Sequence, residues 1–166
     1  MTSTTLSTTT VCTLDEVLQY QNENVTYRFM KAFAVSEEEA EDIFTETKKW
    51  LWLCSQSLQD GVRLVVTDDI GVIDEMWHNF ILFTKDYDYF CQHYFGEYIH
   101  HVPESKANQE ATAEKNEEEN NAAMRNILEQ MFGYIYDKLG EETLVKWYEE
   151  YADKYTPENL LKLRTK

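Results

Sequence analysis

Hydrophobic residues recur at the spacing of a buried helical face along most of this chain, and most clearly after Ser36. Ser36 and Glu39 match the capping box that begins many helices, in which each side chain accepts a hydrogen bond from the other residue's backbone N–H. The helical face that follows consists of Ala40, Ile43, Phe44, Thr47, Trp50, Leu51, Cys54 and Leu58. This pattern predicts one long helix that ends at Gly61.

The same periodicity predicts shorter helices on both sides of this segment. Thr13 and Glu16 form a second capping box, and Thr156-Pro157 is a typical start for a last helix. Helical periods also cover about residues 25–34, 71–81, 84–95, 124–139 and 144–151. Val62 to Val66 has no obvious partner strand, so we interpret it as an extended connector. With five Gly and two Pro in 166 residues, we predict an all-α, single-domain helical bundle of six to eight helices.

Two segments lack a clear helical period. Residues 1–12 are rich in Thr and Ser and are expected to form a disordered leader, which leaves residues 13–166 as the folded domain. Residues 104–120 contain six Glu and two Lys among mostly small and polar residues. Because such a segment has little apolar surface to bury, we expect an acidic mobile loop there, or a frayed entry to the helix that follows.

The net charge of −16 narrows the classes of partner. Proteins that bind nucleic acids or anionic membranes supply Lys and Arg to phosphates, so we expect neither partner here. A protein partner with a basic surface is compatible with this charge. No apolar run approaches the roughly 18 residues of a membrane span, and the leader lacks the features of a secretory signal. Three Cys without a CxxC motif indicate free thiols, so we expect a cytoplasmic location.

All four histidines of the chain lie between residues 68 and 103. Within this stretch, Asp74 and His78 are spaced i and i+4, so their side chains share one helix face. A carboxylate at this spacing can orient an imidazole, as supporting groups do around metal ligands. We therefore expect Asp74 and the neighbouring Trp77 to support His78 from outside the metal's own ligands.

The remaining candidate ligands come later in the same stretch. Cys91 is expected on the following helix, and His100 and His101 on an extended segment that returns after it. Imidazole and thiolate ligands favour Zn²⁺ and, less strongly, Fe²⁺. Neighbouring side chains of an extended segment point apart, so one of these two histidines is expected to bind the ion and the other to form a hydrogen bond. The predicted metal ligands are therefore His78, Cys91, His100 and His101.

This stretch also carries an ordered set of residues: Asp74, Trp77-His78, Thr84, Tyr87, Phe90-Cys91, Gly96, His100-His101 and Pro103. In these positions it resembles the glycine-rich-domain-containing-protein-like family of plants and bacteria. The resemblance covers about residues 68–103 and implies a fold element and a candidate site more than an activity. Members often have a His at the position of Phe80, and some carry a glycine-rich tail that is absent here.

Simpler structural roles explain part of this pattern. His78 could be a buried imidazole that bonds Asp74 and a backbone carbonyl, and a buried free Cys is usually a small apolar residue in a helix interface. No nucleophile elbow, phosphate-binding Gly loop or HExxH motif is present, so the catalytic residues are unknown.

Three functions are compatible with these features. The leading interpretation is a small cytosolic helical protein whose His/Cys cluster binds a metal ion, with zinc favoured, in a structural, interaction or maturation role. A metal-free acidic interaction module, of which an inhibitor is one variant, is the second. The third is a metal-dependent hydrolase or oxidoreductase that uses the same cluster.

Overall fold

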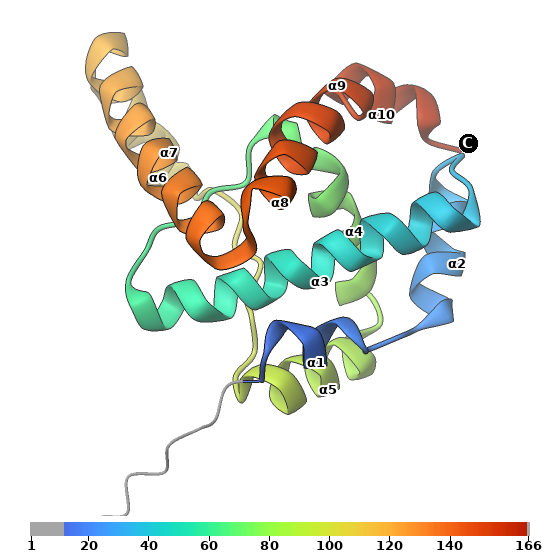
Figure 1. The fold of residues 1–166 in the computed structure, drawn as a ribbon. Coiled ribbons are helices and arrows are strands. Elements are labelled where there is room, and N and C mark those ends of the chain that lie inside the picture. Colours follow the sequence, from blue (N-terminus) through green and yellow to red (C-terminus); the bar gives the residue numbers. More distant parts are fainter. Residues whose placement is uncertain (1–11, 166) are drawn as a thin grey trace, which may run out of the picture.

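A computed structural model describes residues 12–165, and their regular secondary structure is entirely helical (Figure 1). The elements in chain order are α1 (Leu14–Leu18), α2 (Glu23–Ala32), α3 (Glu37–Asp60), a 3₁₀ turn η1 (Asp68–Ile70), α4 (Gly71–Ile81), α5 (Thr84–Phe95), α6 (Lys106–Glu114), α7 (Glu117–Leu139), α8 (Glu141–Val145), a π turn η2 (Lys146–Glu150), α9 (Tyr151–Lys154) and α10 (Pro157–Leu163). The predicted all-α class is confirmed. With α8, η2 and α9 counted as one continuous helix, eight helices in the described part have at least seven residues.

Helix α3 is the central element and crosses the middle of the molecule (Figure 1). It contacts α1, α2, α4 and α7. The capping box of Ser36 and Glu39 is formed at its start, and Gly61 ends it in the left-handed conformation with φ 68°. Glycine adopts this conformation without the steric cost that a Cβ imposes. Both predicted boundaries of the long helix are therefore confirmed.

The rings around Phe80 hold α4 against its neighbours. Phe80 is fully buried, and the rings of Tyr20, Phe44, Tyr87 and Phe90 lie within 5.9 Å of it, centroid to centroid. Three of these four rings stand edge to face with Phe80, which is the arrangement that aromatic quadrupoles favour. Because this core fixes α4 against α3 and α5, it also fixes the residues on the outer face of α4.

A polar seam joins α3 to the continuous helix of α8, η2 and α9. The Glu46 carboxylate is 2% exposed, accepts a hydrogen bond from Trp147 Nε1 at 2.7 Å, and lies 3.2 Å from Lys146 Nζ. One turn earlier on α3, Asp42 accepts hydrogen bonds from Lys146 Nζ at 2.5 Å and from the Tyr151 hydroxyl at 2.6 Å. The buried Glu46 therefore has paired partners, as burial of a charge requires, and the partly exposed Asp42 extends the same network.

The first turn of α3 extends this seam and makes the fold sensitive to acid. Glu39 in this turn forms an ion pair with Lys154 at 2.7 Å and accepts a hydrogen bond from the Ser36 backbone N–H. These two interactions lower the pKa of Glu39 to about 2. The folded pKa is thus below the unfolded value of about 4.3, so Glu39 contributes stability above that value. This contribution is lost as the pH falls from about 4.3 to 2.

Glu39→Gln is therefore expected to lower the free energy of unfolding at neutral pH only. The side chain is 33% exposed, and solvent screening reduces the effect to about 1 kcal/mol at pH 7. Urea denaturation of the variant and the wild type at pH 7 and pH 2 measures this difference. An equal difference at both pH values would show that the carboxylate charge is not its source.

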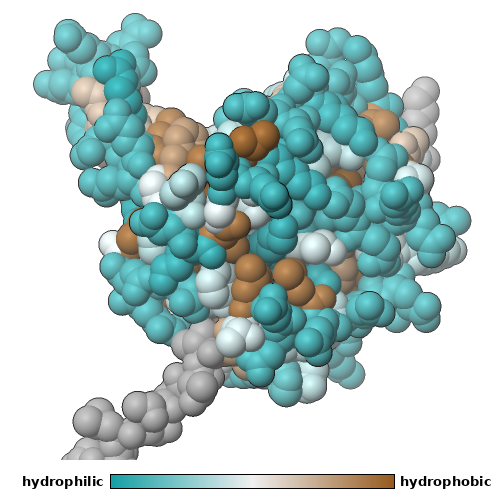
Figure 2. All heavy atoms as spheres, viewed as in Figure 1, coloured by the Kyte–Doolittle hydropathy of each residue, from teal (hydrophilic) through white to brown (hydrophobic). Residues whose placement is uncertain are grey.

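Residues 104–120 differ from the predicted loop. Lys106–Glu114 forms α6, and α7 begins at Glu117, behind the cap of Asn116. The two helices form a hairpin that projects from the body, and its outer end is largely hydrophilic (Figures 1 and 2). No residue of α6 is buried, so the sequence contains no apolar stripe to reveal this helix. The prediction of a loop was wrong for this reason.

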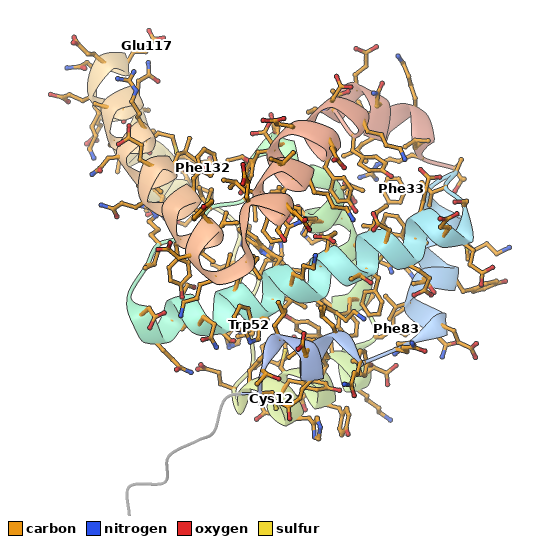
Figure 3. The ribbon with its side chains drawn as sticks, viewed as in Figure 1. Cys12, Phe33, Trp52, Phe83, Glu117 and Phe132 are labelled. Atoms are coloured by element: carbon orange, nitrogen blue, oxygen red, sulfur yellow. The ribbon has the colours of Figure 1, made fainter. Side chains whose placement is uncertain are left out.

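The described residues also decide two other predictions. Val62 to Val66 has no regular secondary structure and pairs with no strand among the described residues, as predicted for a connector. The predicted leader lies outside the described residues except for Cys12, whose carbonyl accepts a hydrogen bond from Trp52 Nε1 at 3.1 Å. Figure 3 shows Cys12 at the start of α1, below Trp52 of α3. Cys12 therefore belongs to the folded domain. In the described part of the chain, no helix is long and apolar enough to cross a membrane.

Candidate metal centre

Helix α4 carries two of the candidate residues on one face. Asp74 lies in its first turn, where the helix dipole favours a carboxylate, and His78 follows four residues later. His78 Nδ1 lies 3.5 Å from Asp74 Oδ2. This distance is longer than a usual N–H···O hydrogen bond, so the two groups are close without being tightly bonded. The predicted shared face of Asp74 and His78 is confirmed.

The third residue arrives on the segment after α5. Gly96 ends α5 in the left-handed conformation, with φ 72°, and the chain then runs without a helix until α6. The Ile99 carbonyl accepts a hydrogen bond from the Tyr87 hydroxyl at 2.6 Å, which fixes this return segment against α5. Two residues later, His101 Nε2 lies 2.7 Å from Asp74 Oδ1. The sequence predicted such a segment but did not specify which histidine would reach α4.

Asp74, His78 and His101 together form the Asp–His–His group. One ligand atom from each residue lies within 4.8 Å of the other two, so the group could hold a metal ion. Two ligands bound at about 2.0–2.2 Å from one ion are separated by roughly 3–3.5 Å. His101 Nε2 and Asp74 Oδ1, at 2.7 Å, are closer than this, so the side chains have to rearrange to hold an ion. His78 is the most exposed of the three residues.

The group is open to solvent on one side. The side chain of His78 is 53% exposed, whereas those of Asp74 and His101 are 24% and 17% exposed. The His101 ring packs on the buried Trp77 with 4.2 Å between ring centroids, and on the His78 ring at 4.3 Å. Trp77 therefore lies against the ring of His101, and its predicted role in supporting a metal site stays a prediction.

Two of the four predicted ligands lie outside the Asp–His–His group. His100 is exposed and packs on the ring of Tyr98, and the adjacent His101 points to Asp74, as expected for neighbours on an extended segment. Cys91 is fully buried on the inner face of α5. Burial raises the pKa of the Cys91 thiol, and the neutral thiol is a poor ligand compared with the thiolate. The structure does not bring Cys91 together with His78 and His101.

Two features of this site were not predicted from the sequence. Asp74 was expected to orient His78, yet its two oxygens face both imidazoles, so it is a candidate ligand itself. Tyr87 joins Trp77 to the return segment, whereas the sequence singled it out only as one position of the ordered set that carries the family resemblance. The sequence did contain one indication that Tyr87 is buried. Its i, i+4 spacing from Cys91 places both residues on the same face of α5.

The UCP032817-like family matches residues 15–130, which is more than half of the 166 residues. The chain belongs to the UCP032817-like family. Its matched region runs from α1 into α7 and contains the whole Asp–His–His group. No curated protein and no solved structure matches the chain. The UCP032817-like match shows no link to glycine-rich-domain proteins, so that resemblance stays a prediction.

Proposed function

We propose that this UCP032817-like protein binds one divalent transition-metal ion through Asp74, His78 and His101. The observation that supports this proposal is the convergence of two imidazoles and one carboxylate, from two separate segments, within 4.8 Å. Two imidazoles and a carboxylate are a donor set that zinc sites and non-haem iron(II) sites share. Zinc remains the favoured ion and iron(II) the alternative. The proposed ligand atoms are two imidazole nitrogens and a carboxylate oxygen, and the thiolate of Cys91 is not among them.

The exposure of His78 and the number of protein ligands favour an open metal site over a closed one. A structural zinc site is usually closed by four protein ligands, whereas a site with three protein ligands keeps a position for water or an external ligand. When bound here, the ion would supply a Lewis acid at the surface of the molecule. It would also link α4 to the return segment, so metal binding would stabilise the fold.

Elemental analysis of protein purified without a histidine tag, combined with melting curves before and after chelation, tests this proposal. One equivalent of zinc or iron and a lower melting temperature after its removal are expected, because only the folded chain brings the three ligands together. Absence of metal, together with an unchanged melting curve in excess zinc and in excess iron(II), would contradict it.

A second candidate function is supported by the α6–α7 hairpin. Glu117 lies at its outer end, far from the point where Phe132 meets the body (Figure 3). Short helices without tertiary packing are marginal in water, and α6 has no buried residue. The first turn of α7 also carries Glu117, Glu118 and Glu119. We infer that this hairpin is a docking surface for a protein with a basic surface.

A fluorescent lysine-rich peptide provides a probe for this second function. Its binding is expected to weaken as salt rises, because exposed charges are screened. Replacing Glu117 and Glu118 by Gln should weaken binding more than replacing the exposed Glu149 and Glu150 of η2 by Gln, which removes the same number of charges. Equal binding by both variants would show that the peptide responds to net charge alone.

A further inference from the structure

We propose that Tyr87 is a positioning residue of the Asp–His–His group, because its hydroxyl sets where His101 lies. This inference rests on the proposed metal site and identifies what prepares it for binding. Tyr87 itself does not belong to the group. It is fully buried on α5 and forms a hydrogen bond with Trp77, the ring on which His101 packs.

The Tyr87 hydroxyl connects two groups that both act on His101. It accepts a hydrogen bond from Trp77 Nε1 at 2.9 Å and donates one to the Ile99 carbonyl at 2.6 Å. Trp77 in turn packs against the imidazole of His101. Ile99 precedes His101 by two residues, so its position sets the register of the return segment. One hydroxyl therefore constrains His101 through its backbone and through the ring beside it.

Burial makes this connection hard to replace. Tyr87 is 0% exposed, Ile99 3% and Trp77 5%, so water has little access to any of the three. Loss of the hydroxyl would leave the Trp77 N–H and the Ile99 carbonyl without a partner, and buried polar groups without partners are costly. Burial also raises the pKa of the Tyr87 phenol, so the hydroxyl remains a donor at neutral pH.

The position of His101 matters because the ion must find its ligands in place. The nearest pair in the group, His101 Nε2 and Asp74 Oδ1, is 2.7 Å apart, whereas His78 is half exposed and free to adjust. The hydrogen bonds of Tyr87 thus fix His101 on the less exposed side of the group, whereas the half-exposed His78 can adjust to the ion. Groups that orient metal ligands from outside typically change metal affinity about 10–100-fold when they are removed.

Tyr87→Phe tests this inference, with Tyr151→Phe as the matched control. Tyr151 is also a buried tyrosine whose hydroxyl donates a hydrogen bond, to Asp42 at 2.6 Å, but it lies in α9 and outside the Asp–His–His group. Both variants are expected to lose stability. Only Tyr87→Phe is expected to weaken zinc binding, by about 10–100-fold in competition with a chromophoric chelator.

A second readout does not depend on the metal. In the apo protein, the imidazole protons of His101 lie next to the Trp77 ring, so their NMR signals carry a ring-current shift. Tyr87→Phe is expected to change this shift, and Tyr151→Phe is expected to leave it unchanged. If the wild type binds neither zinc nor iron, the proposed function fails, and the NMR comparison alone still decides whether Tyr87 positions His101.

Wild-type zinc affinity together with a wild-type His101 spectrum in Tyr87→Phe would overturn the inference. If Tyr87→Phe does not fold, Trp77→Phe takes its place, because it removes the N–H donor and keeps the Tyr87 bond to Ile99. Roughly 10-fold weaker zinc binding is then expected. Zinc affinity is the readout for this variant, because replacing the Trp77 ring changes the ring-current shift of His101 directly. An unchanged zinc affinity in that variant would equally exclude the positioning role.

Discussion

His101→Ala is expected to weaken zinc binding by more than the roughly 10–100-fold that supporting residues contribute. It removes one of the three ligands and the only one supplied by the return segment, since Asp74 and His78 both lie on α4. The two residues left on α4 can offer an ion only one imidazole and one carboxylate. Competition with a chromophoric chelator, at a pH where the imidazoles are neutral, gives the dissociation constant.

His100→Ala is the matched control for this prediction. The two histidines are adjacent, yet His100 is exposed and contacts Tyr98, whereas only His101 reaches Asp74. Zinc affinity in His100→Ala is expected to equal that of the wild type. Equal losses in the two variants would place the site elsewhere on the return segment. An unaffected His101→Ala would remove His101 from the site.

Glu46→Ala is expected to give the largest loss of stability outside the candidate site, about 3 kcal/mol. Glu46 accepts hydrogen bonds from Lys49 Nζ at 2.9 Å and from Trp147 Nε1 at 2.7 Å while 2% exposed. Its removal leaves the Trp147 N–H buried without a partner and unbalances two lysines. Because Lys49 and Lys146 are 21% and 27% exposed, water compensates them in part, which keeps the loss at the lower end for a broken buried pair.

Urea denaturation at pH 7 measures this loss, and Glu41→Ala provides the control. Glu41 lies on the same helix with its side chain exposed, so its replacement should change the free energy of unfolding by less than about 0.5 kcal/mol. The comparison removes the effects of helix propensity and net charge, which both variants share. Similar losses in the two variants would show that the buried seam does not stabilise the fold.

The sequence predicted the helices that bury an apolar face. Capping residues and periodic apolar positions marked α3 at both ends, since its local signals and its packing agree. Helix α6 escaped detection because its nine residues bury nothing, so no periodicity separates it from a loop. The seam around Glu46 escaped detection for another reason. Its partners Lys146 and Trp147 are 100 or more positions later in the chain, and only tertiary packing brings them to α3.

The candidate site was predicted in part for similar reasons. Local spacing identified Asp74 and His78, because four residues on one helix fix their relation. The choice between His100 and His101 depends on the register of the return segment, which the distant Tyr87 sets. Cys91 was predicted as a ligand from its residue type. Its position along α5, however, places it on the buried face of that helix together with Tyr87. Residue type therefore suggested the chemistry, and packing selected the residues.

A metal-free role for the same contacts must be distinguished from the proposed one. Asp74 could hold His101 by a hydrogen bond alone, at 2.7 Å, and so fix the return segment on α4. That role needs only one imidazole. The second imidazole, His78, lies 3.5 Å from the other oxygen of Asp74 and is half exposed, so it adds little to such a hydrogen bond. Its presence in the group is what favours a metal ion.

X-ray absorption spectroscopy of the metal-loaded protein tests the central claim most directly. The Asp–His–His group predicts a first coordination sphere of nitrogen and oxygen at about 2.0–2.2 Å, with the outer scattering of two imidazoles. Sulfur at about 2.3 Å would show instead that Cys91 or another thiolate binds the ion. A spectrum without imidazole scattering, or a protein that retains no metal, would contradict a metal centre at Asp74, His78 and His101.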